Sequence, residues 1–370
     1  MSVRRVLVAF VATALLISFA MILTSCGESD SGTDSGSKAE PIKIALLLPE
    51  TKTARYETQD RPLFEAKVKE LEPDAEILYS NANQDATEQQ SQADAALTNG
   101  ADVLVLDPVD SASAASIVAK AKDQGVPVIS YDRLTMNCDL DYYISFDNEK
   151  VGTLQGQALL DKITADGNAG KTIVMINGSP TDNNATLFKK GAHSVLDGKV
   201  VIGAEYDTPD WSPDKAQTEM DQAITKLGKD GFVAVYCAND GTCGGAIAAM
   251  KGAGIDPKKR PTTGQDAELA AIQRILLGEQ YMTVYKAIKP EAETAAELAV
   301  ALAKGEDVPS TMKISKVNNG QKDVDSILLD PIAVMTANIQ ATIVTDGFWT
   351  VAQIESTPEL EAAGKAAGLQ

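Results

Sequence analysis

Short apolar runs alternate with amphipathic stretches along most of the chain, beginning at Pro41. The run IKIALLL at Ile42–Leu48 is typical of a buried strand, and Pro62–Leu71 carries apolar residues at helical spacing. Further strands are predicted at Ala75–Ser80, Asp102–Leu106, Val126–Tyr131, Thr172–Ile176, Val200–Tyr206, Phe232–Tyr236 and Thr262–Gly264, and further helices at Ala86–Asn99 and Ala112–Asp123. This alternation indicates an α/β fold, with parallel sheets covered by helices on both faces.

Polar clusters follow four of the predicted strands. They are Tyr131–Arg133, Gly178–Asp182, Cys237–Asp240 and Gly264–Asp266. Ligands of open α/β sheets bind outside the carboxyl ends of the strands, so these clusters are the first candidates for a site. A helix N-cap is the alternative for each one, because Asp, Asn and Ser are preferred there. Four clusters that together carry Arg, Asp, Asn and Gln favour a ligand site.

The first 40 residues have a different pattern. Arg4 and Arg5 precede an apolar stretch that ends in Leu-Thr-Ser before Cys26. This is the anatomy of an export signal over residues 1–25, and the small residues before Cys26 resemble the cleavage site of a bacterial lipoprotein, with Cys26 lipidated. A transmembrane anchor is the alternative. Residues 26–40 predict a flexible acidic Gly/Ser tether. The body is therefore expected outside the cytoplasm, anchored to the cell membrane.

Composition excludes several classes of protein. The 370 residues include 52 acidic and 33 basic ones, a net charge of −19, which argues against a nucleic-acid partner. The single histidine, His193, removes most Ser-His-Asp chemistry. The cysteines lack the spacing of a zinc site, so we expect no metal and no cofactor. In an oxidising compartment we expect a Cys237–Cys243 disulfide, with two buried thiols as the alternative, and no assigned role for Cys138.

Longer motifs resemble the periplasmic sugar-binding proteins of ABC transporters, of the ribose, galactose and xylose type. The strongest are YISFDNEKVG at residues 143–152 and GSPTDNNA at residues 178–185. The resemblance is nearest to D-xylose-binding members. It implies a type I periplasmic-binding-protein fold, in which two lobes, each a parallel sheet flanked by helices, are joined by a three-crossover hinge. The expected N-lobe comprises residues 41–147 plus 287–310, and the C-lobe residues 148–286 plus 311–358.

The same resemblance implies a sugar site in the cleft between the lobes. It assigns ligand-binding roles to Arg55, Tyr56, Arg133, Asn184, Trp211, Asn239, Asp266 and Lys286, with Asp132 and Asp182 as neighbours that contact the sugar or support its ligands. This mixture suits a sugar, because Arg and Lys only donate hydrogen bonds, carboxylates only accept them, and Asn does both. An aromatic face covers the C–H surface of the ring.

The resemblance implies a binding protein, not an enzyme, and no catalytic residue is assigned. It would capture a monosaccharide, D-xylose first, and deliver it as a monomer to an ABC permease and ATPase. The segments DWSPD (210–214) and GEQYMTVYK (278–286) resemble receptors for several monosaccharides, so uptake or chemosensing of glucose, galactose and arabinose is the alternative. A glycoside-processing enzyme using Asp182 and Asp266 is a remote alternative, which turnover of the sugar would distinguish.

Overall fold

The computed structural model describes residues 40–370, and residues 41–370 form one compact unit. The expected export signal, Cys26 and all but the last residue of the tether lie outside the described residues. Within the described part, no helix is both long enough and apolar enough to cross a bilayer.

Strands and helices alternate through the described residues, as the hydrophobic pattern predicts. The strands are β1 (Lys43–Leu48), β2 (Glu76–Asn81), β3 (Val103–Leu106), β4 (Val128–Tyr131), β5 (Tyr142–Phe146), β6 (Thr172–Asn177), β7 (Val201–Asp207), β8 (Ala234–Cys237), β9 (Thr283–Tyr285), β10 (Ser315–Asn318), β11 (Asp323–Leu329) and β12 (Ile332–Val334). The helices are α1 (Arg61–Leu71), α2 (Ala86–Thr98), α3 (Ala115–Asp123), α4 (Asn148–Ala165), α5 (Asn183–Leu196), α6 (Pro213–Leu227), α7 (Asp240–Gly252), α8 (Leu269–Leu276), α9 (Ile288–Ala303), α10 (Val351–Ile354) and α11 (Pro358–Ala367). Short helical turns are η1 (Tyr56–Asp60), η2 (Pro209–Trp211), η3 (Pro257–Lys259), η4 (Thr336–Asn338) and η5 (Gln340–Val344).

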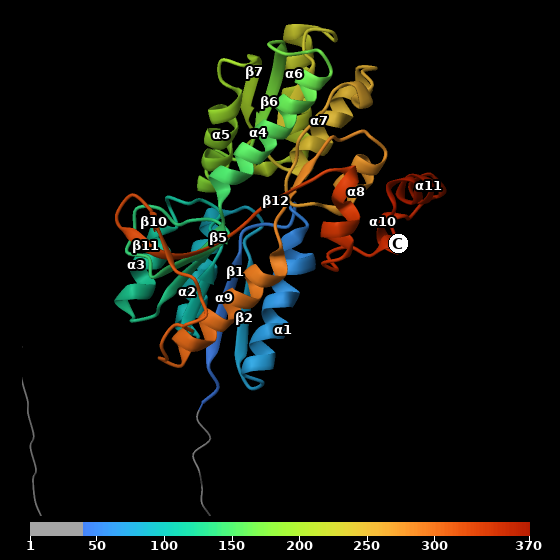
Figure 1. Cartoon of the computed structure of the whole chain (residues 1–370). Coiled ribbons are helices and arrows are strands. Elements are labelled where there is room, and N and C mark those ends of the chain that lie inside the picture. The colour runs from blue at the N-terminus through green and yellow to red at the C-terminus, as the bar shows by residue number, and fades with distance from the viewer. Residues whose placement is uncertain (1–39) are drawn as a thin grey trace, which may run out of the picture. The chain divides into compact units, whose positions relative to one another are not determined.

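The first lobe is built on a seven-stranded sheet with the order β10-β11-β5-β4-β3-β1-β2. Its strands are parallel except β10, which runs antiparallel to β11. Helices α1 and α9 pack with strand residues in one hydrophobic cluster, and α2 and α3 in a second one. Because both faces are covered, β1 and β3 carry continuous apolar runs, IALLL and VLVL. Figure 1 shows this lobe below the second one.

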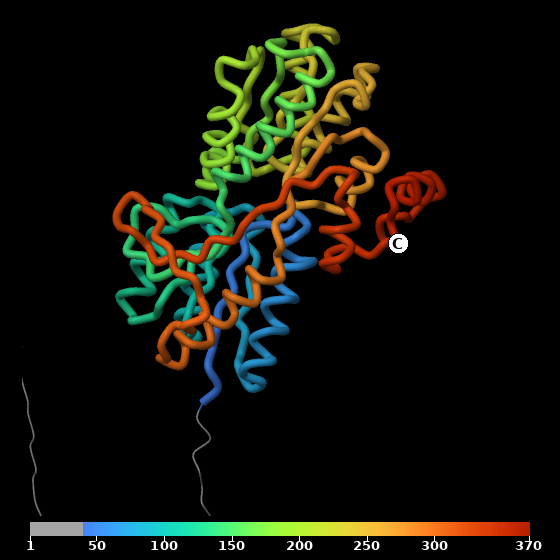
Figure 2. The backbone as a smooth tube through the Cα atoms, viewed as in Figure 1, coloured from blue at the N-terminus to red at the C-terminus, as the bar shows by residue number. Residues whose placement is uncertain are grey.

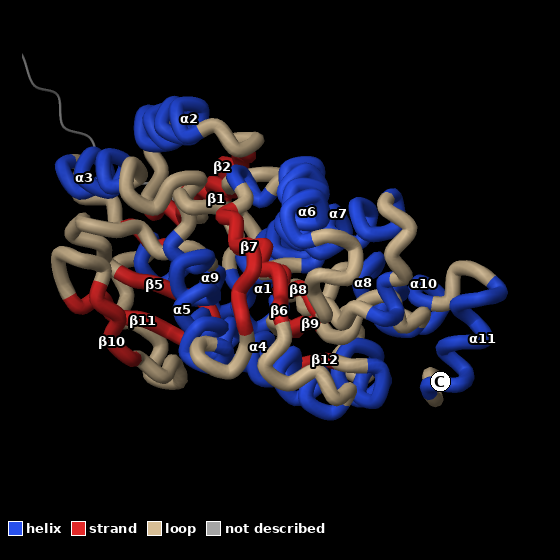
Figure 3. The backbone as a smooth tube through the Cα atoms, turned by 90° about the horizontal axis from the view of Figure 1, so that it is seen from above, coloured by secondary structure: helices blue, strands red, loops and turns tan. Residues whose placement is uncertain are grey.

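The second lobe contains the parallel sheet β7-β6-β8 and the antiparallel pair β9 and β12. Helices α4 and α5 contribute to one apolar cluster around this sheet, and α6 and α7 to another. In the view from above, α6 and α7 lie on one side of β6 and β8, and α4 lies on the other (Figure 3). The strand expected at Thr262–Gly264 is reduced to one bridge from Thr262 to Val235, because the chain changes partner and bridges β9 at Gln265.

Three connections carry the chain between the lobes, and Figure 2 lets the reader follow them. The first joins β5 to α4 at Asp147, and the second joins β9 to α9 at Lys286 and Ala287. The third was expected near Ser310. The structure instead adds β10 and β11 to the first sheet, where β11 pairs with β5, so the chain crosses only after Leu329. Residues 315–329 therefore lie in the first lobe, which corrects the expected boundary.

The cysteines in residues 40–370 are all free and buried. The expected Cys237–Cys243 disulfide is therefore not present in this structure, and the alternative of two buried thiols describes it. Both side chains belong to the apolar cluster of α6 and α7, where thiols pack as small hydrophobic groups. Burial raises the pKa of Cys138 to about 11, so this thiol stays protonated at neutral pH.

Candidate functional site

A small polar cavity lies where the loops that follow the strands of both lobes meet. Its lining consists of Thr53, Tyr56, Asp132, Arg133, Asp182, Asn184, Phe188, Trp211, Asn239, Gln265, Asp266 and Lys286. This set contains every residue expected in the sugar site except Arg55. The four polar clusters of the sequence therefore converge on one cavity.

The guanidinium of Arg55 is buried behind the cavity and contacts three carboxylates. Its Nε donates to Asp60 at 2.9 Å, and its terminal nitrogens lie 3.3 Å from Asp132 and 2.7 Å from Glu291. Arg55 does not line the cavity, which differs from its expected role as a sugar ligand. Arg55 instead supports Asp132, because its guanidinium donates to that carboxylate and to those of Asp60 and Glu291.

Three lining residues were not predicted: Thr53, Phe188 and Gln265. Gln265 precedes Asp266 in a cluster already recognised, so its position was a usable signal. Phe188 follows Asn184 by four residues on α5, which places both on one helix face. Thr53 lies in the loop after β1, and nothing in the sequence distinguishes it from its neighbours.

Two residues, Asp182 and Asn239, are helix N-caps and also line the cavity. Asp182 is the N-cap of α5 and accepts from the backbone N–H of Asn184 at 2.8 Å, yet it also lines the cavity. Asn239 caps α7 through Thr242 at 2.9 Å and lines the cavity as well. The capping hydrogen bonds already fix both side chains at the strand ends, so little side-chain entropy remains to be lost when a ligand binds.

Three residues at or beside the cavity have left-handed backbone conformations. Asp132 has a φ of 53° directly after β4, and Asp266 and Ala267 have φ values of 95° and 51° before α8. Left-handed conformations at non-glycine residues cost roughly 1–3 kcal/mol each and gather at binding sites. The surrounding hydrogen bonds must hold these turns in place.

Asp132 is a buried carboxylate with three donors of different kinds. It accepts from the Tyr56 hydroxyl at 2.9 Å and from Lys286 at 3.1 Å, in addition to Arg55. Burial acts to raise the pKa of Asp132, but the charges of Arg55, Lys286 and Arg133 outweigh it and hold this pKa below its ordinary value. Asp132 therefore stays ionised and fixes the cationic side of the cavity.

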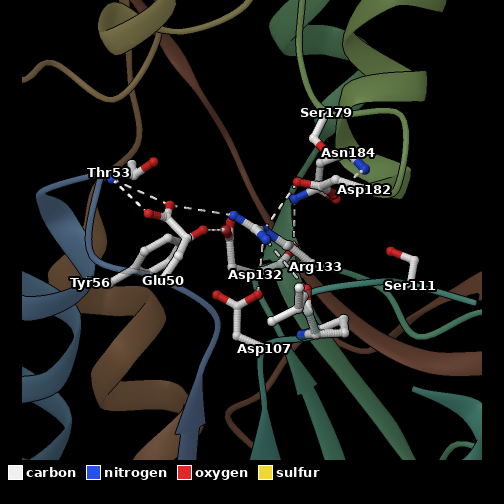
Figure 4. Close-up of polar contacts among 12 residues, drawn as sticks. Glu50, Thr53, Tyr56, Asp107, Ser111, Asp132, Arg133, Ser179, Asp182 and Asn184 are labelled. Carbon is white, nitrogen blue, oxygen red and sulfur yellow. Dashed lines mark hydrogen bonds and ion pairs between the residues drawn. The ribbon is translucent and has the colours of Figure 1, made fainter. Parts of the chain in front are cut away.

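Arg133 connects the two lobes beside the cavity (Figure 4). Its Nε lies 3.1 Å from Asp182 Oδ2, the oxygen that also accepts from the indole N–H of Trp211 at 3.1 Å. Glu50 and Asp107 lie 3.7 and 3.6 Å from the same guanidinium. Burial raises the pKa of Asp107 well above its usual range, against the effect of Arg133. The guanidinium of Arg133 is thus the cation beside three buried acidic side chains.

Direct hydrogen bonds between the lobes surround the cavity. The Asn184 amide donates to the backbone oxygen of Asp132 at 2.9 Å, and the Ser111 N–H donates to the carbonyl of Thr181 at 2.9 Å. The lobes are therefore in contact at the cavity, which is a closed arrangement. A hinge rotation at the three connections would separate these contacts.

Trp211 forms an apolar wall of the cavity. It is 5% exposed, and its ring meets Phe188 edge to face with centroids 6.3 Å apart. Gly178 leaves the space for the indole, because a Cβ at this position would collide with the ring of Trp211. Ring packing on Phe188 and the hydrogen bond to Asp182 thus hold the indole in the space that Gly178 leaves open.

Two acceptors on residues that line the cavity lack any hydrogen-bond donor. They are Asp266 Oδ1 and Gln265 Oε1, both buried. The Lys286 ammonium lies 3.6 Å from Asp266, beyond hydrogen-bond distance. Burial raises the pKa of Asp266, while Lys286 acts to lower it. Because buried polar atoms are nearly always paired, these two oxygens indicate a ligand that donates hydrogen bonds.

The buried carboxyl of Glu291 should make the free energy of unfolding depend on pH. Burial raises its pKa to about 8, although Arg55 acts to lower it. Between roughly pH 4 and 8 the folded protein keeps a proton that the unfolded chain releases, so stability falls as the pH rises. Glu291→Gln is expected to reduce the slope of the unfolding free energy against pH by up to about 1.4 kcal/mol per pH unit. Urea unfolding at pH 5, 6.5 and 8 measures this slope.

Glu293→Gln, on the same helix but 36% exposed, is the control and should leave the slope unchanged. Asp240, whose pKa burial raises to about 7, contributes to the same window in every variant and cancels from the comparison. Equal slopes for Glu291→Gln and the unsubstituted protein would contradict the prediction.

The described residues contain no group of three or more His, Cys, Asp or Glu side chains that could hold a metal ion. The carboxylates of the site face Arg and Lys instead. The arrangement offers charged and neutral hydrogen-bonding groups and aromatic walls to a small polar molecule.

Comparisons with known proteins agree with this architecture. The model of the family "Periplasmic binding protein domain" matches residues 44–307. A D-xylose-binding periplasmic protein of Haemophilus influenzae is 40% identical over 321 residues, covering 85% of this chain and 93% of the relative. The multiple sugar-binding periplasmic receptor ChvE of Rhizobium radiobacter is 32% identical over 362 residues, covering 92% and 98%.

Among solved structures, an ABC transporter solute-binding protein of Clostridium phytofermentans with bound β-D-glucose matches with a TM-score of 0.77 and 30% identity. The match covers 85% of this chain and 100% of that one. These relatives are described as binding and transport proteins, not as enzymes. With a closed two-lobed fold, a polar cavity between the lobes and a family match over most of its length, this chain belongs to the periplasmic binding protein family.

Proposed function

We propose that this protein is an extracytoplasmic solute-binding protein that captures a monosaccharide, D-xylose first, in the cavity between its lobes. The observation that carries the proposal is a pair of unpartnered buried acceptors, Asp266 Oδ1 and Gln265 Oε1, on two residues that line a cavity with an aromatic wall. Sugar hydroxyls would donate to both oxygens, and the indole of Trp211 would cover apolar C–H groups. The 40% identity to a D-xylose-binding protein supports D-xylose as the first sugar.

Donors for the sugar oxygens come from the same wall. Arg133, Lys286 and Asn239 line the cavity, and each carries N–H groups that could donate to a hydroxyl or ring oxygen of a sugar. A missing or inverted hydroxyl would leave one of these buried groups unpaired. That penalty is how such a site distinguishes sugars.

The proposed cycle follows from the division of the site between two lobes. Tyr56, Asp132 and Arg133 come from the first lobe, and Asn184, Trp211 and Asp266 from the second. A sugar that touches both sets binds the closed form more tightly, which shifts the hinge equilibrium toward closure. In our proposal the closed protein, as a monomer, delivers the sugar to an ABC permease and its ATPase.

A receptor for several monosaccharides is the second candidate. Its support is the 32% identity to ChvE over 98% of that protein, together with the DWSPD segment that carries Trp211. The glycoside-processing alternative lacks such support. Asp182, one of its two carboxylates, is already engaged by Arg133 and Trp211.

Membrane attachment through Cys26 is the part of the proposal that rests on sequence alone. Its support is the apolar segment that ends in Leu-Thr-Ser-Cys, followed by the acidic tether. The lipid would hold the sugar-binding body at the outer surface of the cell membrane. Mass spectrometry of the mature N-terminus tests this part, because lipidation adds a diacylglyceryl mass to Cys26.

Calorimetric titration of the purified protein with D-xylose, D-glucose, D-galactose and L-arabinose tests the proposed function. We expect tight binding of D-xylose and much weaker binding of the hexoses, which carry an additional hydroxymethyl group. Comparable affinities for several of the sugars would favour the multiple-monosaccharide receptor. No heat with any of them would contradict a monosaccharide site.

A further inference from the structure

The turn that carries Asp266 is held by the C-terminal segment of the chain. The indole N–H of Trp349 donates to the carbonyl oxygen of Ala267 at 2.8 Å, across 82 positions of sequence. Ala267 is fully buried and directly follows Asp266. Trp349 does not line the cavity, so it reaches the proposed sugar site only through this carbonyl.

The turn needs such support because its backbone is strained. Asp266 and Ala267 have φ values of 95° and 51°, a region that non-glycine residues rarely occupy. The N–H groups of the turn are bound within the second lobe, to Val284, to Thr283 and to Asp240. The Ala267 carbonyl is bound by the C-terminal segment instead.

The segment that carries Trp349 is itself firmly placed. Phe348 packs edge to face on Tyr285 with centroids 5.0 Å apart, and on Trp349 at 5.3 Å. The amide of Gln273 on α8 donates to the carbonyl of Ile354 at 3.2 Å. These contacts tie the segment to β9 and to α8, so the indole is held in place as a donor.

We propose that Trp349 is a positioning residue for ligand binding: its N–H holds the Ala267 carbonyl and thereby the left-handed turn that places Asp266 at the wall of the cavity. This inference rests on the proposed function for its effect on sugar affinity. Its effect on the turn itself does not depend on which ligand binds. The two parts are therefore measured separately.

The first measurement is hydrogen exchange of the full chain without sugar, comparing Trp349→Phe with the unsubstituted protein. Phenylalanine keeps most of the ring packing and removes the donor. Loss of one hydrogen bond is expected to speed exchange of the amides at residues 264–268 by about fivefold. Leu360→Ala, in the same apolar cluster, is the control that disturbs packing but keeps the indole bond. Unchanged exchange at 264–268 in Trp349→Phe would overturn the proposal.

The second measurement is a double-substitution cycle with D-xylose in calorimetric titration. Trp349→Phe alone is expected to weaken binding about five- to tenfold, and to cause no further loss when Asp266 is already Asn, because it acts through Asp266. An equal loss in both backgrounds, or an equal loss in Leu360→Ala, would show a merely structural role and overturn the proposal. If the unsubstituted protein binds no monosaccharide, the proposed function fails, and the exchange result alone decides whether Trp349 holds the turn.

Discussion

Replacing Asp266 with Asn is expected to weaken D-xylose binding about 30-fold or more. In the structure Asp266 lines the cavity, and its Oδ1 is buried without a hydrogen-bond donor. A hydrogen bond from a sugar hydroxyl to a charged acceptor contributes about 1.5–3 kcal/mol. The amide has the same shape but no charge, and one of its two terminal atoms cannot accept. Calorimetric titration of both proteins measures the difference.

Asp230→Asn is the matched control, because the side chain of Asp230 is fully exposed in the same lobe. Its affinity for D-xylose should equal that of the unsubstituted protein. The melting temperature of Asp266→Asn should also be close to the original, since Oδ1 accepts no hydrogen bond from the protein and the loss of the Lys286 contact is offset by the removal of a buried charge. An affinity within twofold of the original would remove Asp266 from the proposed ligand set.

Arg133→Ala is expected to lower the free energy of unfolding by about 3–5 kcal/mol and to abolish measurable sugar binding. Its guanidinium is 3% exposed and faces Glu50, Asp107 and Asp182, so its removal leaves three buried acids without their cation. The contact with Asp182 also joins the lobes, and Asp182 in turn holds Trp211. Urea unfolding followed by titration measures both effects.

Arg61→Ala provides the comparison for this prediction. Arg61 also faces carboxylates, Glu57 and Glu65, but its side chain is 38% exposed. Exposed pairs of this kind are worth less than about 1 kcal/mol. Similar losses of stability for Arg61→Ala and Arg133→Ala would contradict the view that burial makes Arg133 important.

Much of the site could be predicted because its residues follow strands. Parallel strands bring their carboxyl ends to one edge of a sheet, so clusters such as Tyr131–Arg133 and Gly264–Asp266 converge whatever the details of packing. The role of Arg55 could not be predicted in this way. Its carboxylate partners Asp132 and Glu291 are 77 and 236 positions away, and no local pattern tells whether an arginine faces a cavity or an acid behind it.

The third connection between the lobes was the part of the fold that the sequence indicated least. Strand β10 has the sequence SKVN and lies at the edge of its sheet, largely exposed, so it lacks the apolar run of a buried strand. Strand β12 has three residues, too few for a periodic pattern. Their positions depend on pairing with β11 and β9, which only the assembled sheets determine.

A crystal structure of the protein grown with D-xylose would show whether the cavity between the lobes holds the sugar. We predict one sugar in the cavity between the lobes, with its ring against Trp211 and hydroxyl groups within hydrogen-bond distance of Asp266 Oδ1 and Gln265 Oε1. Arg55 should remain with its carboxylates and out of contact with the sugar. A sugar bound elsewhere, or one in the cavity that leaves both oxygens unpaired, would contradict the account.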